Sequence, residues 1–243
     1  MFRKKWIGYL FLVTWFSSLA SGATIFFGSS GSLSASIRFE LAGGNLEATF
    51  SNLSTHDVTQ PSQILTAVFF DIAGNPSLSR ISAVVAPDST VWFGGTDPGG
   101  VVGGEWAYTS SLSGAPRGAQ QGITSAGFDL FGPGDRFPGT NLQGPHSPDG
   151  IQYGITSLGD NPLTGNAPVT GSQALIHNSV AFTLGGLPSE FKLEDVSNVW
   201  FQYGTSLTEP GFPDNPNPEP ASILLVVPGL IWAIWRYRAR PRS

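Results

Sequence analysis

Three histidines, His56, His146 and His177, are the first candidates for chemistry in this chain. His56 stands next to Asp57 in a polar turn, and serines are frequent, so a Ser-His-Asp triad can be assembled on paper. The G-x-S-x-G sequence that carries the nucleophile of many hydrolases is missing, however. We expect His146 in a loop and His177 in a strand, where it could face solvent. The histidines therefore predict no catalytic site.

Metal and phosphate sites have characteristic spacings, and the sequence contains none of them: no H-E-x-x-H, no G-x-x-x-x-G-K-[ST] and no G-x-G-x-x-G opening a helix. The chain has no cysteine, which removes thiol chemistry, cysteine-rich zinc sites and iron–sulfur clusters. Calcium is the more plausible ion, because carboxylate and carbonyl oxygens near turns suit it. The candidate residues are Asp71, Asp97, Asp129, Asp135, Asp149, Asp160 and Asn161. No loop matches an EF-hand, and Asp and Asn also favour turns for local reasons, so we expect no cofactor.

Tryptophans offer a second kind of site. Trp92, Trp106 and Trp200 could form a flat face on which sugar rings stack. The alternative is that they fill the core, which we favour for Trp200 because Val199 and Phe201 flank it. The glycan-binding module that such a face would make is kept as an alternative function.

Charge divides the chain into three parts. Residues 24–217 contain five basic and sixteen acidic residues, a net charge of −11, whereas the remaining basic residues lie near the two ends. Such an acidic domain disfavours nucleic acid as a partner and suits cations, neutral glycans or proteins. Its 194 residues are enough for one domain with a core.

The elements that would position these residues are short strands. Residues 33–41 and 45–52 alternate apolar and polar positions around Gly43-Gly44 and predict a hairpin. Residues 64–72 form a continuous apolar run that predicts a central strand. Further strands are predicted at 81–86, 90–93, 105–110, 174–184 and 196–204. The frequent Gly and Pro breaks, and the lack of a sustained helical period, predict an all-β fold, a single antiparallel β-sandwich that is jelly-roll-like or immunoglobulin-like.

Residues 111–170 differ from the rest because they are rich in Gly and Pro, and long loops of this kind are often functional. Within them, 121–127 resembles 153–159, and Gln152-Tyr153-Gly154 recurs at 202–204. We interpret these as similar strand–turn pieces, with chance similarity as the alternative.

The N-terminus has the three parts of an export signal. Arg3-Lys4-Lys5 precedes an apolar run, and small residues follow it up to Ala23. We expect cleavage between Ala23 and Thr24. An uncleaved anchor is the alternative, which the short apolar run disfavours.

The C-terminus also has three parts. Pro218-Glu219-Pro220 is followed by fifteen uncharged residues at 221–235, which would make a helix of about 22 Å. Four arginines come next, and they would hold that end in the cytoplasm; they are Arg236, Arg238, Arg240 and Arg242.

This arrangement resembles the PEP-CTERM sorting signal of bacterial surface proteins. The resemblance implies recognition of Pro218, Glu219 and Pro220 by an exosortase, passage through an inner-membrane intermediate, loss of the tail, and delivery to the cell surface or extracellular matrix. A plain tail anchor is the alternative. Residues 65–71 and 201–210 are also similar to a group of exosortase-dependent surface proteins, which implies no catalytic residue.

We therefore expect an exported, non-enzymatic surface or matrix protein, with an exopolysaccharide-binding module and then a secreted hydrolase as alternatives. The expected organisation is a signal peptide at 1–23, a β-sandwich ectodomain at 24–210, a Pro-rich linker at 211–220, a transmembrane helix at 221–235 and a basic tail at 236–243.

Overall fold

The computed structural model describes residues 22–94, 99–144, 146, 148–164, 169 and 173–215. The expected signal peptide up to residue 21, the Pro-Glu-Pro motif, the membrane segment 221–235 and the arginines of the tail lie outside these ranges. Ala23 and Thr24, the expected cleavage pair, are the first two residues of strand β1 (Ala23–Ser30). Within the described ranges, no helix has the length and apolar character needed to cross a membrane.

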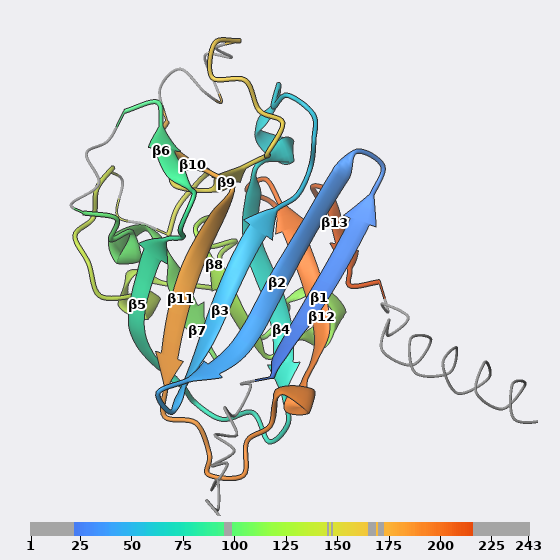
Figure 1. Cartoon of the computed structure of the whole chain (residues 1–243), viewed down its shortest axis with the longest axis vertical. Coiled ribbons are helices and arrows are strands. Elements are labelled where there is room, and N and C mark those ends of the chain that lie inside the picture. The colour runs from blue at the N-terminus through green and yellow to red at the C-terminus, as the bar shows by residue number, and fades with distance from the viewer. Residues whose placement is uncertain are drawn as a thin grey trace, which may run out of the picture.

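The fold is all-β. Five antiparallel strands form the first sheet, in the order β1-β2-β3-β11-β5 (Figure 1). Their bounds after β1 are β2 (Leu33–Ala42), β3 (Asn45–Asn52), β5 (Ser79–Val85) and β11 (Ser179–Gly185). Gly43 and Gly44 both have positive φ, as a two-residue hairpin turn requires, so the predicted hairpin of β2 and β3 is confirmed.

The second sheet runs β13-β12-β4-β9-β10-β6, with β8 on β4 and β7 on β8. Its strands are β4 (Leu65–Ile72), β6 (Thr90–Trp92), β7 (Ala107–Thr109), β8 (Gln121–Thr124), β9 (Ile155–Thr156), β10 (Leu175–His177), β12 (Val196–Tyr203) and β13 (Gly211–Pro213). Strand β4 has partners on both edges, which confirms that the apolar run is central. One correction concerns the pairing of β9 with β10, which is parallel rather than antiparallel.

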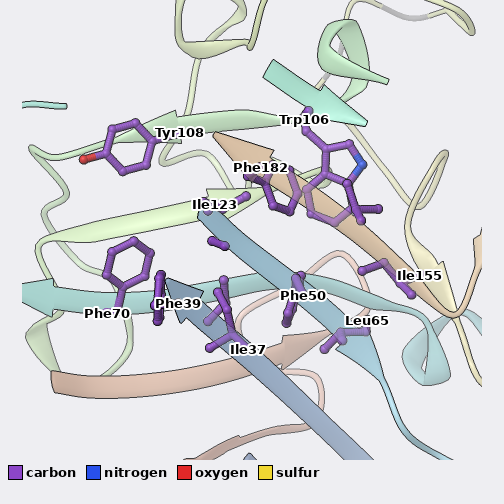
Figure 2. Close-up of a cluster of buried hydrophobic side chains, with 14 of the residues drawn as sticks. Ile37, Phe39, Phe50, Leu65, Phe70, Trp106, Tyr108, Ile123, Ile155 and Phe182 are labelled. Atoms are coloured by element: carbon purple, nitrogen blue, oxygen red, sulfur yellow. The ribbon is translucent and has the colours of Figure 1, made fainter. Parts of the chain in front are cut away.

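The two sheets pack in a sandwich-like arrangement around one main core. Figure 2 shows aromatic side chains from both sheets meeting there. Phe39 of the first sheet contacts Phe70 of the second with ring centres 5.3 Å apart, and Trp106 lies against Phe182 at 5.1 Å. A second cluster, which includes Phe69, Phe128 and Phe131, lies on the opposite face of β4.

A buried polar link joins the two sheets. Asn52, at the end of β3, donates from its side-chain amide to the carbonyl oxygen of Ile155 at 2.9 Å. Its side-chain oxygen accepts bonds from the Ser54 amide and from the Tyr203 hydroxyl, which also donates to the Ser34 carbonyl. Asn52 and Tyr203 are fully buried, so each needs these partners. The link therefore holds β3 of the first sheet in a defined position against β9 and β12.

Strands β1, β8, β9 and β13 were not predicted. Strands β8, β9 and β13 have two to four residues each and little local pattern, so their pairing with β4 or β12 defines them. The predicted strand at 174–184 divides into β10 and β11 at Asn178, whose φ of +85° breaks the extended backbone. The similar pieces at 121–127 and 153–159 contain β8 and β9, which both pair with β4, as expected for strand–turn pieces.

The buried link makes a prediction about stability. Asn52→Ala should lower the free energy of unfolding by about 2–3 kcal/mol, because it leaves the Ile155 carbonyl buried without that donor. Tyr203→Phe should cost only about 1 kcal/mol, because the Ser34 carbonyl keeps its bond from the Leu53 amide. Urea denaturation of the two variants measures both costs. Equal costs would contradict the central place given to Asn52.

Candidate functional site

A pocket of about 460 Å³ lies over the outer face of the second sheet. Three loops form it, and all of them belong to the Gly- and Pro-rich part of the chain or to the turn after β12. The lining residues that can interact with a ligand through polar side chains are Asp129, His146, Asp149 and Thr205. The described structure therefore brings two of the aspartates proposed as calcium ligands together with one of the histidines.

An unusual backbone places Asp129 at this pocket. Gly127, Phe128 and Asp129 have successive φ values of +77°, +56° and +59°, and the amides of Leu130 and Phe131 both donate to the Gly127 carbonyl. This tight turn sends the rings of Phe128 and Phe131 against Phe69, at 6.1 and 6.4 Å, while Asp129 stays exposed. Burial of the two phenylalanines thus offsets the cost of the left-handed backbone.

The opposite wall comes from residues 148–150. A side chain at Gly127 would approach the Pro148 carbonyl to 2.5 Å, so only glycine lets the two loops come this close. The side-chain amide of Gln152 donates to the Asp149 carbonyl and thereby holds the 148–150 loop in place. The glycines at 127 and 150 were the signal in the sequence that could have indicated a contact between loops.

The other expected calcium ligands are occupied elsewhere. Asp71 accepts bonds from the Gln120 amide and the Asn198 side chain, and Asp135 accepts one from the Gly132 amide. Asp160 and Asn161 belong to another loop pair, and Asp97 lies outside the described residues. No group of three His, Cys, Asp or Glu residues that could hold a metal ion occurs in the described ranges.

The polar groups around His56 form hydrogen bonds with the backbone. The Ser157 hydroxyl donates to the His56 carbonyl at 2.5 Å, and the Ser54 hydroxyl oxygen accepts from the Ser34 amide. Asp57 accepts from the Asn161 amide. The hollow between these residues measures about 10 Å³. His177 packs its ring on Trp92, with centres 4.1 Å apart.

The three tryptophans do not form the flat face considered as an alternative, because Trp106 is buried. Trp106 is fully buried in the main core, where its indole N–H donates to the Tyr153 carbonyl at 3.1 Å. Trp92 stacks on His177, and Trp200 is half-buried and donates to the side chain of Gln202. Trp200, the residue expected in the core, is half-buried and packs against the second core cluster, whereas Trp106 is the one that fills the main core. Trp106 directly precedes β7, which pairs with β8, and its ring packs against Phe50 and Phe182 of the first sheet.

Two carboxyl groups, Asp57 and Asp160, join the loop after β3 to the loop after β9. They hydrogen-bond to each other, and Asp160 also accepts from the Val58 amide and the Thr156 hydroxyl. Burial raises the pKa of Asp160, which is 7% exposed. The hydrogen bond from the Asn161 amide lowers the pKa of Asp57. The pKa values of the two groups are thus shifted in opposite directions. The sequence contained no spacing that indicated this pair.

Comparison with known proteins found no match: no family model, no curated protein and no solved structure is similar to this chain. The sorting-signal resemblance therefore rests on the residues of the sequence.

The carboxyl pair predicts an opposite pH dependence for two variants. Asp160 has a raised pKa, so its contribution to stability is lost as the pH rises from about 4 through the raised value. Asp160→Asn keeps the shape and removes that titration, so its stability relative to the unchanged protein should increase from pH 4 to pH 7. Asp57 has a lowered pKa, and its contribution is lost as the pH falls. Asp57→Asn should therefore be destabilised most above pH 4, relative to the unchanged protein. Urea denaturation across this range measures both trends, and parallel pH profiles for all three proteins would contradict the pairing.

Proposed function

We propose that this protein is an exported, non-enzymatic surface or extracellular-matrix protein that an exosortase sorts and processes. The observation that carries the proposal is the three-part C-terminus of Pro218-Glu219-Pro220, the apolar run 221–235 and the basic tail, behind an N-terminal export signal. An enzyme that cuts at the motif needs an extended backbone there, and a residue before proline favours one. The partners are the exosortase, the membrane and, at the destination, exopolysaccharide.

Two features of the described domain support this assignment: its acidic charge, and the contact between its first strand and its last described residue. It is acidic and all-β, as suits a protein placed among neutral or cationic surface polymers. Its first strand and its last described residue lie side by side, because the Asn215 amide donates to the Phe27 carbonyl. The jelly-roll-like or immunoglobulin-like topology stays a prediction of this proposal.

The pocket favours a second candidate function, the binding of a glycan. Its volume falls in the range of small-molecule sites, and its carboxylates can accept hydrogen bonds from sugar hydroxyls. A glycosidase would need paired acids beside the bound sugar ring. Asp129 and Asp149 do line one pocket, but Phe128 and Phe131 are packed into the second core cluster and offer no exposed platform. We therefore propose binding without catalysis as the role of this pocket.

The sorting proposal predicts where the protein accumulates. Glu219→Gln, or deletion of 236–242, should leave the protein in the inner membrane, because recognition or topology is lost. Cell fractionation with antibody detection, in strains with and without the host exosortase, measures this.

The matched control replaces the four arginines of the tail with lysine, which preserves the positive charge that sets topology. Surface delivery should continue in that variant. Equal delivery of the unchanged protein in both strains would show that an exosortase takes no part.

The glycan proposal predicts a loss of affinity. The double variant Asp129→Asn, Asp149→Asn should weaken binding of host exopolysaccharide fragments by at least about tenfold, because hydrogen bonds to charged groups contribute about 1.5–3 kcal/mol each. Isothermal titration calorimetry measures the affinity. Asp88→Asn is the control, since Asp88 is exposed on a turn and does not line the pocket. The same affinity for all three proteins would exclude this pocket as the site.

A further inference from the structure

The pocket of Asp129 and Asp149 carries negative charge that no basic side chain offsets. Both aspartates are exposed, and each stands on a different wall of the pocket. Residues 24–217 contain only five basic residues, and the structure describes all of them: Arg38, Arg80, Arg117, Arg136 and Lys192. None of these five is among the described residues that line the pocket. A ligand that enters it therefore meets two carboxylates and no cationic side chain.

Three of the arginines are engaged in contacts of their own. Arg38 Nη1 lies 2.5 Å from Glu40 Oε1 on the first sheet. Arg80 Nη1 lies 3.7 Å from Asp135 Oδ1, and Arg136 donates from Nε to a carbonyl of its own turn. Their charges thus act on other parts of the domain.

The two aspartates also differ from the acidic residue nearest to them in the third wall. Glu209 belongs to the turn that supplies Thr205 to the pocket, and its carboxylate accepts from the amides of Thr205 and Ser206 at 2.6 and 2.9 Å. Among the described residues, no hydrogen bond or ion pair within the protein uses the side chain of Asp129 or Asp149. The fold therefore uses the charge of Glu209 and leaves the charges of the two pocket aspartates to a ligand.

We propose that this pocket selects glycans with protonated amino groups, such as oligomers of glucosamine, over neutral and acidic glycans. An ammonium group donates up to three hydrogen bonds and accepts none, which suits a pocket whose charged groups are acceptors. Its bonds to carboxylates are charge-assisted and stronger than those of a sugar hydroxyl. The inference rests on the proposed glycan-binding role of the pocket and names the class of glycan.

Acidic glycans fit the same pocket poorly. Their carboxylates would lie beside Asp129 and Asp149 without a basic side chain to pair with, and like charges brought together oppose binding. The net charge of −11 on residues 24–217 adds a long-range attraction for any cationic polymer. That general attraction is screened beyond about 8 Å at 0.15 M salt, so measurements at this ionic strength favour contacts inside the pocket.

A matched pair of glycans tests the selection. Glucosamine oligomers and N-acetylglucosamine oligomers of equal length share one backbone and differ in the charge of the amino group. Isothermal titration calorimetry is carried out on the full-length protein in detergent, at mildly acidic pH, where the amino groups are protonated and exposed aspartates stay ionised. The glucosamine oligomer should bind at least about tenfold more tightly. The double variant Asp129→Asn, Asp149→Asn should lose this preference.

A control variant separates the pocket from the charge of the whole domain. Asp88→Asn with Glu194→Gln removes the same two negative charges from exposed positions that do not line the pocket, and it should keep the preference. An equal loss in the control and the pocket variant would overturn the inference, because general attraction would then explain the binding. Equal affinity of the unchanged protein for both oligomers would also overturn it and leave the glycan-binding role standing. Binding of neither oligomer, nor of host exopolysaccharide, would exclude that role itself and the inference with it.

Discussion

Burial of both faces of β4 is the constraint on which the rest of the structure depends. Val68, Phe70 and Ile72 face the main core between the sheets, whereas Ala67 and Phe69 face the other way and need a separate cover. The Gly- and Pro-rich loops supply it, through Phe128 and Phe131 among others. A sandwich of two sheets alone would leave Phe69 in water, at a cost of about 2 kcal/mol or more.

The pocket follows from that cover. The turn at Gly127 sends Phe128 and Phe131 inward over β4. Asp129, which lies between them in the sequence, stays exposed beside the loop of Asp149. Loops fixed by buried aromatic anchors hold polar side chains in defined places, which is the usual basis of a binding site on a β scaffold. The same loops that stabilise the sheet thus form the candidate site.

Polar contacts at the other end of the domain connect segments that are distant in the sequence. Asn52 and Tyr203 join the two sheets through buried hydrogen bonds, and the hydrogen bonds of Asp57 and Asp160 join two loops. On the remaining side, the chain after β13 passes from the second sheet to the edge of β1 at Asn215. Each of these connections unites segments that are more than a hundred residues apart, so the ends of the domain are tied into its fold.

The sequence by itself determined the all-β class, the hairpin at Gly43-Gly44 and the central place of the 64–72 run, because alternation, paired glycines and a continuous apolar stretch are local signals. It also contained the three-part patterns at the two ends on which the sorting proposal rests. Only the tertiary structure decided that Trp106 is a core residue, that 174–184 divides at Asn178, and that Asp129, His146 and Asp149 share a pocket. These outcomes depend on contacts between distant loops and strands, and no spacing along the chain encodes such contacts.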